Sequence, residues 1–213
     1  MKVIVTGASK GIGKGIASYL AMDGFTVGGL ARSADLLADL RASITEGGGR
    51  CHVAACDIRD PDDTERSIHA LADAMAGVDA LVNNAGIVLR RSVWDIRPEE
   101  WRALIETNVT GLFHATRAVL PRFRDQQSGH VINISSISGK VPLPGGSAYA
   151  ASKFAVTGFS HSLLQEVREY GIKVTTIFPG SVDTASHRHD PTADASWKVT
   201  PEEIGRACAF VLR

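Results

Sequence analysis

A tyrosine and a lysine four residues apart are the side chains of this sequence best suited to acid–base chemistry. Tyr149 and Lys153 flank Ala-Ala-Ser, and residues four apart lie on one face of a helix. Free tyrosine ionises at about pH 10, so proton transfer at neutral pH needs a pKa shift of about three units, or roughly 4 kcal/mol. A cation about 4 Å away supplies about that much. We therefore expect Lys153 to lower the pKa of Tyr149 and make it a proton donor or acceptor. The spacing alone also fits a solvated helix face.

A glycine-rich turn follows the first expected strand. Residues 2–6 form a short β-branched run that ends at glycine, as a buried parallel strand does. The next segment reads Gly7-Ala-Ser-Lys-Gly-Ile-Gly13 and leads into a helical pattern over residues 14–22. Such a turn lets the backbone approach a pyrophosphate at the positive end of the helix dipole. Although an ordinary tight turn is the alternative, the strand before it and the helix after it favour dinucleotide binding.

Two basic residues could select between the nicotinamide dinucleotides. The second expected strand, residues 25–31, ends in Ala31, where an NAD site has a carboxylate for the ribose 2′-hydroxyl. Arg32 follows it, and Lys10 lies in the glycine-rich turn. Because two cations can converge on a 2′-phosphate, we expect NADP (NADPH) rather than NAD. The alternative is a pair of solvated surface charges.

Strands and helices alternate along the rest of the chain, which is typical of an α/β fold. The further expected strands span residues 50–56, 79–82, 130–134 and 172–178. The further expected helices span residues 34–46, a segment from 61, 98–124, 149–170 and 204–212. Open α/β sheets bind ligands at the carboxyl ends of their strands, where this chain has Asn83-Asn-Ala-Gly86, Ser135-Ser136 and Pro179-Gly180. The first of these segments alone could also be a plain turn.

The expected helix over residues 98–124 has an unusual interior. It contains Thr107, Asn108 and Gly111, which are poor helix formers. An asparagine inside a helix can divert a backbone carbonyl and kink the helix. We therefore expect a kink at Asn108.

The composition excludes several classes of partner. The 213 residues are enough for one domain with a large core, and 23 basic residues balance 23 acidic ones. Without a basic run or a long apolar stretch, neither nucleic acid nor a membrane is an expected partner. No signal-peptide pattern opens the chain, so we expect a cytoplasmic location. The three cysteines have no metal-ligand spacing, and we interpret them as reduced packing residues.

A polar loop over residues 185–199 contains His187, His189 and Asp190. These residue types could bind a metal, but no partner ligands accompany them. We expect no metal here and interpret the loop as a lid over the substrate.

Taken together, the motifs resemble the short-chain dehydrogenase/reductase family almost from end to end. Six of them keep the family's order and separations: residues 6–13, Asn83-Asn-Ala-Gly86, Asn108, Ser136, Tyr149-x-x-x-Lys153 and Pro179-Gly180. The resemblance implies a single α/β domain over residues 1–213, with a Rossmann-type, doubly wound parallel sheet and helices on both faces. It also implies reversible hydride transfer between a nicotinamide ring and a carbonyl or alcohol.

The resemblance implies roles for individual residues as well. Tyr149 would be the general acid in carbonyl reduction and the base in alcohol oxidation, while Lys153 would lower its pKa and hold the nicotinamide ribose. Ser136 would hydrogen-bond the substrate oxygen, and Asn108 would keep a water in a proton relay. The implied cofactor contacts are Gly7, Ser9, Gly11, Ile12 and Gly13 at the pyrophosphate, Asp57 and Ile58 at the adenine, and Asn84, Ala85 and Gly86 at the adenosine ribose. Basic residues at the positions of Lys10 and Arg32 go with NADP in the family. Tyr149 and Lys153 are implied contacts as well, as are Pro179, Gly180, Val182 and Thr184, the last two at the nicotinamide amide.

One departure concerns the end of the sequence. Family members usually continue past the last helix into a further parallel strand, whereas this sequence stops at Arg213. We therefore expect the family's last edge strand to be missing. We also expect a homodimer or homotetramer that associates through the helix of Tyr149 and the helix over residues 98–124.

Three hypotheses of function remain. The favoured one is an NADP(H)-dependent carbonyl reductase for a ketone or 3-oxoacyl type of substrate. The same residues would serve an NAD(P)-linked alcohol dehydrogenase that works oxidatively. A non-catalytic NADP(H)-sensing protein is the third, and the complete set Asn108, Ser136, Tyr149 and Lys153 argues against it.

Overall fold

Six parallel strands form one sheet in the computed structural model, which describes residues 1–184 and 196–213. The strands are β1 (Lys2–Thr6), β2 (Thr26–Ala31), β3 (Arg50–Ala55), β4 (Ala80–Asn83), β5 (Gly129–Ile134) and β6 (Ile172–Ile177). Their order across the sheet is β3-β2-β1-β4-β5-β6, and every pairing is parallel. This is the order of a doubly wound dinucleotide-binding sheet, so the expected fold class is confirmed.

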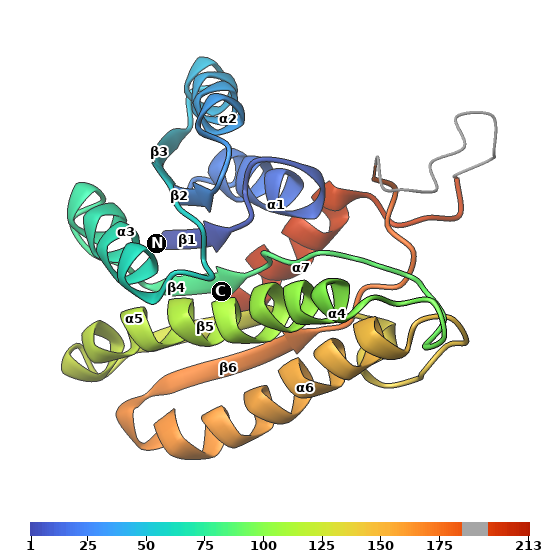
Figure 1. Cartoon of the computed structure of the whole chain (residues 1–213). Helices are drawn as coiled ribbons and strands as arrows, with labels where there is room; N and C mark the ends of the chain where they lie inside the picture. Colours follow the sequence, from blue (N-terminus) through green and yellow to red (C-terminus); the bar gives the residue numbers. More distant parts are fainter. Residues whose placement is uncertain (185–195) are drawn as a thin grey trace.

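Helices cover both faces of this sheet (Figure 1). The helices are α1 (Gly11–Met22), α2 (Ala34–Glu46), α3 (Pro61–Ala74), α4 (Pro98–Ile105), α5 (Gly111–Asp125), α6 (Ser147–Val167) and α7 (Pro201–Leu212). Residues of α1, α2 and α7 form the core on one face, and residues of α3, α5 and α6 form the core on the other. Because all six strands are parallel, their carboxyl ends meet at one edge of the sheet.

Alternate residues of the central strand β1 belong to the two opposite cores. Val3 and Val5 lie in the core with α1 and α7, whereas Ile4 lies in the core with α3 and α5. All three side chains are fully buried. A parallel strand covered on both faces needs apolar residues throughout, which is why β1 reads as a continuous apolar run. The buried strands give the carboxyl edge a rigid support.

The expected long helix over residues 98–124 is interrupted by a π-helical segment, η1 (Glu106–Thr110), between α4 and α5. Asn108 lies in this segment, so the irregularity is confirmed at the expected residue. The expected cause is wrong, because the Asn108 side chain does not divert a carbonyl of its own helix. Its Oδ1 accepts from Ile87 N at 2.8 Å, and its Nδ2 donates to Ile87 O at 3.0 Å. The side chain thus bonds a distant loop, and the π turn allows that reach.

Some element boundaries differ from the sequence prediction. Helix α1 begins at Gly11 and not at residue 14, so the last three residues of the glycine-rich turn belong to its first helical turn. Helix α7 begins at Pro201, behind the capping box of Thr200 and Glu203. Among the described residues, β3 and β6 are the two edge strands of the sheet.

The cysteines are packing residues, as expected. All three are free thiols, and Cys56 and Cys208 are buried. Burial raises the pKa of Cys51 and Cys56 to about 11 and that of Cys208 to about 12. Thiols with such pKa values are weak nucleophiles at neutral pH.

None of the described helices combines the length and the apolar composition that a membrane-spanning helix needs.

Candidate active site

The glycine-rich turn packs the start of α1 against the end of β4. Gly7 and Gly11 have left-handed backbone angles, with φ of 69° and 55°, which favour glycine. A Cβ atom at Gly7 would lie 2.8 Å from Ala85 Cα, and one at Gly13 would overlap the Gly7 carbonyl oxygen. No described side chain caps α1, and its first turn contains no acidic residue. Its free N–H groups can therefore donate hydrogen bonds to an anionic pyrophosphate.

Thr6 and Asn84 fasten the turn after β4 to the end of β1. The Thr6 hydroxyl accepts from the N–H groups of Asn84 and Ala85 at 3.1 and 3.0 Å. In return, Asn84 Nδ2 donates to the Thr6 carbonyl at 3.0 Å. These bonds make residues 83–86 more than a plain turn, because they hold Asn84, Ala85 and Gly86 beside the glycine-rich turn.

Tyr149 and Lys153 lie on the buried side of α6, near its beginning. The exposed fractions of the two residues are 9% and 7%. Lys153 Nζ lies 5.9 Å from the centre of the Tyr149 ring. The shared face that the four-residue spacing predicts is confirmed, and the solvated-face alternative is excluded.

The pKa of Tyr149 is raised and not lowered, so that expectation is wrong for the protein alone. Burial is the largest cause, while a hydrogen bond with Ser136 and the charge of Arg90 act in the opposite direction. The Lys153 ammonium donates to the Ile134 carbonyl at 2.9 Å, which holds it toward β5. Burial also lowers the pKa of Lys153 to about 8. At pH 7 the phenol is therefore protonated and most of the lysine is charged.

Ser136 and Asn108 reach the tyrosine from two other elements. Ser136 follows β5, is 9% exposed, and hydrogen-bonds the Tyr149 side chain. Asn108 Nδ2 donates to Ser152 Oγ at 3.1 Å, and Ser152 Oγ donates to the Tyr149 carbonyl at 2.7 Å. The structure thus brings the four expected catalytic residues into one buried cluster at the carboxyl edge.

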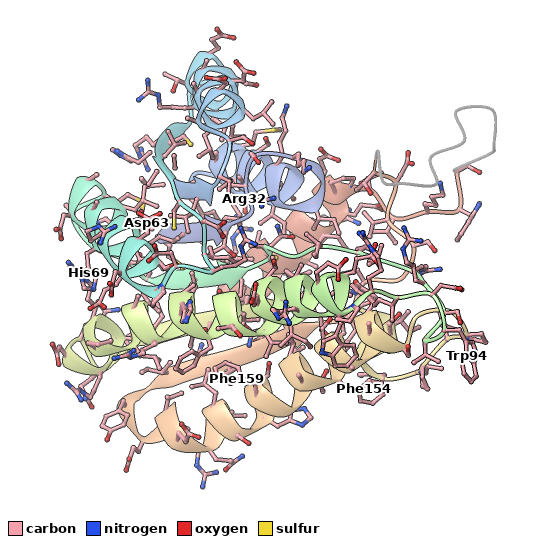
Figure 2. The ribbon with its side chains drawn as sticks, viewed as in Figure 1. Arg32, Asp63, His69, Trp94, Phe154 and Phe159 are labelled. Carbon is pink, nitrogen blue, oxygen red and sulfur yellow. The ribbon has the colours of Figure 1, made fainter. Side chains whose placement is uncertain are left out.

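The expected adenosine end of the site is charged and exposed. Arg32 directly follows β2, and Lys10 directly precedes α1; both side chains are exposed. Figure 2 shows Arg32 beside α1. Asp57 follows β3, and its carboxylate is held by Arg59, with 2.6 Å between Asp57 Oδ2 and Arg59 Nη2. Ile58 is buried, and a Cβ atom at Gly111 would overlap its side chain.

The segment after β6 approaches the glycine-rich turn. The Pro179 carbonyl accepts from Ile137 N at 3.0 Å, and Val182 forms an isolated parallel bridge with Val199. A Cβ atom at Gly11 would lie 3.7 Å from Thr184 Cγ2. Thr184 is therefore close to the start of α1. Gly180 lies between these contacts, on the same edge of the sheet.

Most of the expected substrate lid lies outside the described residues, including His187, His189 and Asp190. Within residues 1–184 and 196–213, no group of three or more His, Cys, Asp or Glu side chains could hold a metal ion.

Three residues that support the site were not among the sequence predictions. Thr6 clamps the turn after β4, Ser152 links Asn108 to α6, and Arg59 binds Asp57. Each had a local signal: Thr6 directly precedes the glycine-rich turn, Ser152 is three residues after Tyr149, and Arg59 is two residues after an aspartate, as in an Asx-turn.

A doubly wound sheet with a glycine-rich first turn and a buried Tyr–Lys pair at its carboxyl edge is the arrangement of a dinucleotide-dependent oxidoreductase. A family model described as short chain dehydrogenase matches residues 1–194. The chain therefore belongs to the short-chain dehydrogenase/reductase family, whose members act on small molecules.

Curated relatives and solved structures agree with this family. The chain is 38% identical over 217 residues to the 3-oxoacyl-[acyl-carrier-protein] reductase FabG of Vibrio cholerae, covering 98% of this chain and 88% of that protein. It superposes on an actinorhodin polyketide ketoreductase with NADPH at a TM-score of 0.91, with 29% identity, covering 100% of this chain and 90% of the other. An alcohol dehydrogenase of Thermococcus sibiricus, complexed with 5-hydroxy-NADP, also has a TM-score of 0.91, with 26% identity and coverages of 99% and 89%.

Proposed function

We propose that this protein is an NADPH-dependent carbonyl reductase for a ketone or 3-oxoacyl type of substrate. The observation that carries the proposal is the buried cluster around Tyr149, in which the phenol is protonated, hydrogen-bonded to Ser136 and close to the charged Lys153. A protonated phenol is ready to give a proton, which suits carbonyl reduction. The names of the related 3-oxoacyl reductase and polyketide ketoreductase support the same reaction.

The residues present fit a nicotinamide dinucleotide. Cβ atoms at Gly7 and Gly13 would clash with Ala85 and with the Gly7 carbonyl, so glycine at these positions lets the turn pack closely at the start of α1 and leaves its N–H groups for a pyrophosphate. Among the described residues only the Ile134 carbonyl accepts from Lys153 Nζ, which leaves two of its N–H bonds for ribose hydroxyls. Arg32 and Lys10 would hold the 2′-phosphate. The further proposed cofactor contacts are Ser9, Gly11, Ile12, Asp57, Ile58, Asn84, Ala85, Gly86, Tyr149, Pro179, Gly180, Val182 and Thr184.

The cluster can orient a carbonyl and supply its proton. A bound nicotinamide would supply the hydride. Ser136 donates a hydrogen bond to the substrate oxygen and holds it near Tyr149. Tyr149 transfers its phenolic proton to that oxygen as negative charge develops there, which completes the alcohol. Burial of the pair limits access of bulk water to the transferred proton.

Asn108 would contribute to the reprotonation of Tyr149 through the main chain of its π turn. Its carboxamide bonds the Ile87 N–H, the Ile87 carbonyl and the Ser152 hydroxyl, so the side chain is engaged. The carbonyls of the π turn are the groups left to hold a relay water. Such a water would return a proton to Tyr149 by way of Lys153 after each turnover.

A Tyr149→Phe variant tests the proposal. NADPH oxidation is followed with a panel of ketones and 3-oxoacyl thioesters, and NADPH binding is followed by nicotinamide fluorescence. Because general acid catalysis contributes about 10²–10⁴-fold, we expect kcat/KM to fall by about that factor while the Kd for NADPH stays within about twofold. Tyr170→Phe, in the 3-10 turn after α6, is the matched control and should retain activity. Full activity of Tyr149→Phe would refute the assignment.

The second candidate is an alcohol dehydrogenase that works oxidatively, because a related structure carries that name. Rates with a matched ketone and alcohol at pH 7 separate the two. The protonated state of Tyr149 predicts the faster rate for the ketone. A faster alcohol oxidation would favour the alternative.

The third candidate is a cofactor-sensing protein without catalysis. Such a protein would bind NADPH equally well as wild type and as the Tyr149→Phe variant, and neither form would turn over. Turnover of any panel substrate that depends on Tyr149 excludes it.

We also propose a homodimer or homotetramer in the cytoplasm. Exposed aromatic side chains lie on α4, α5 and α6, namely Trp101, Phe113 and Phe154, each 44% exposed. Figure 2 shows Phe154 on the outside of α6. Association through these helices would remove the three side chains from water. Sedimentation of wild type and Phe113→Asp tests the association, which the charge should weaken.

A further inference from the structure

Arg59, which lies outside the expected cofactor contacts, is tied to the Asp57 carboxylate. Its Nε donates to both carboxylate oxygens at 3.0 Å, and its Nη2 donates to Oδ2 at 2.6 Å. Its main-chain N–H also donates to Oδ1 at 3.1 Å. Several charge-assisted bonds to one carboxylate give a definite geometry. The Asp57 charge is therefore matched locally by a cation that the backbone turn itself positions.

Asp57 and Arg32 are neighbours at the carboxyl edge of the sheet. Strands β2 and β3 are in register up to Ala31, and Cys56 N donates to the Ala31 carbonyl at 2.8 Å. Arg32 directly follows Ala31, and Asp57 directly follows Cys56. In agreement, the charge of Arg32 contributes to the lowered pKa of Asp57, after the larger effects of Arg59.

If the negative charge of Asp57 had no cation beside it, this carboxylate would weaken the binding of a nearby phosphate in two ways. It repels the phosphate directly, and it attracts Arg32, the cation that would otherwise bind the phosphate. We propose that Arg59 is a cofactor-selectivity residue that acts through Asp57, because by matching this carboxylate it leaves the charge of Arg32 free for the 2′-phosphate of NADP(H). The inference rests on the proposed function, in which Arg32 holds that phosphate.

Two details bear on this role. The donors of Arg59 are directed to Asp57, so the inference assigns it a positioning role and not a direct phosphate contact. Glu106 also interacts with Arg59, more weakly than Asp57 does. A test must therefore separate an effect through Asp57 from effects through Glu106 or through direct contact.

A double-mutant cycle makes that separation. The dissociation constants of NADPH and NADH are measured by nicotinamide fluorescence for wild type, Arg59→Gln, Asp57→Asn and the double variant. The quantity compared is the ratio of the NADH constant to the NADPH constant, in which any effect on the shared adenine cancels. Arg66→Gln is the matched control, because it removes another exposed arginine–aspartate pair, with Asp63, on α3. Thermal unfolding checks that every variant is folded.

We expect Arg59→Gln to lower the ratio by about fivefold, mainly through weaker NADPH binding, as suits one unmatched charge near a phosphate in a partly solvated site. In the Asp57→Asn background the same change should lower it by less than about twofold. Arg66→Gln should leave it unchanged.

Two results would overturn the inference while leaving the cofactor proposal standing. An unchanged ratio of dissociation constants in Arg59→Gln would show that the charge of Arg59 does not affect binding of the 2′-phosphate. A loss that persists in the Asp57→Asn background would show that Arg59 acts directly or through Glu106. A wild-type protein without a preference for NADPH would instead refute the cofactor proposal, and this inference with it.

Discussion

The carboxyl edge of the sheet holds two groups of site residues that differ in burial and in charge. Along β1, β2 and β3, the cations Lys10 and Arg32 are exposed, and the glycine-rich turn is exposed at Gly11 but buried at Ala8, Ser9 and Gly13. Along β4, β5 and β6, the expected catalytic side chains are buried, with Asn108 2% and Lys153 7% exposed. The first group uses backbone N–H groups and solvated charges, and the second uses fixed side-chain geometry.

This difference has a consequence for stability. An exposed charge is solvated in both the folded and the unfolded chain, so it affects folding little. A buried ammonium or phenol loses hydration on folding, which costs free energy unless its partners restore it. Changes in the first group should therefore alter affinity and selectivity, whereas changes in the second should alter chemistry and stability together.

Among the predicted changes, Lys153→Met should have the largest effect on activity. It should also change activity and stability together. It would remove the two charge-assisted hydrogen bonds that we propose to the cofactor and the charge beside Tyr149, so we expect kcat/KM to fall by about a thousandfold. The same change should stabilise the protein without cofactor. Burial lowers the Lys153 pKa from 10.5 to about 8, and each unit is about 1.4 kcal/mol. The buried charge thus costs about 3 kcal/mol at pH 7, and an unpaired Ile134 carbonyl returns about 1 kcal/mol of that.

Urea unfolding at several pH values checks this prediction. The unfolded chain keeps the lysine proton up to about pH 10.5, but the folded chain loses it above about pH 8. Wild-type stability should therefore rise relative to Lys153→Met as pH increases from 8 to 10.5, because the folded state no longer carries the buried charge. Equal stability of the two proteins at pH 7 would contradict a costly buried charge.

Gly13→Ala tests whether the backbone N–H groups of the glycine-rich turn bind the cofactor. Its Cβ atom would overlap the Gly7 carbonyl oxygen, so the turn must shift and move the N–H groups away from the pyrophosphate. Losing about two charge-assisted bonds of about 1.5 kcal/mol each weakens NADPH binding by roughly a hundredfold. Gly158→Ala on α6 is the control, because a Cβ atom there meets nothing within 4 Å among the described residues. Nicotinamide fluorescence measures both, and unchanged binding by Gly13→Ala would remove the turn from the site.

Arg32→Asp should have a smaller effect, confined to the choice of cofactor. It removes a phosphate partner and adds a carboxylate for the ribose 2′-hydroxyl. We expect the ratio of the NADH and NADPH dissociation constants to fall about thirtyfold, with little change in the unfolding temperature. Arg168→Asp makes the same charge change just before β6, at the opposite edge, and should leave the ratio unaltered. A fall of similar size in Arg168→Asp would mean that only net charge matters.

The parts of the fold and site that could be predicted are those encoded locally. The strands are short apolar runs, and the shared face of Tyr149 and Lys153 follows from helix geometry, so both expectations were confirmed. The direction of the Tyr149 pKa shift was wrong, because burial of the phenol, which arises from the packing of distant segments, outweighs the groups that lower the pKa. The cause of the irregular helix was wrong for the same reason, since the partner of Asn108 is Ile87, in a distant loop. Contacts between distant segments are not visible in local spacing.

A buried histidine at the amino end of β5 gives the smallest predicted effect. His130 in β5 is buried, and its Nε2 lies 2.8 Å from Thr175 Oγ1. Burial, followed by the charge of Lys173, lowers the His130 pKa to about 4. The unfolded chain takes up this proton below about pH 6.5 and the folded chain only below about pH 4, so the stability from neutral His130 is lost as pH falls between these values.

His130→Gln should remove this acid sensitivity while keeping a hydrogen-bonding group near Thr175. Between pH 7 and pH 4.5, wild type should lose about 2 kcal/mol more unfolding free energy than the variant does. His161→Gln, an exposed position on α6, should behave as wild type. Because His130 belongs to the buried half of the sheet, its titration should leave the ratio of the NADH and NADPH dissociation constants unchanged. If the ratio followed the same pH dependence, the separation between a selectivity half and a stability half of the sheet would fail.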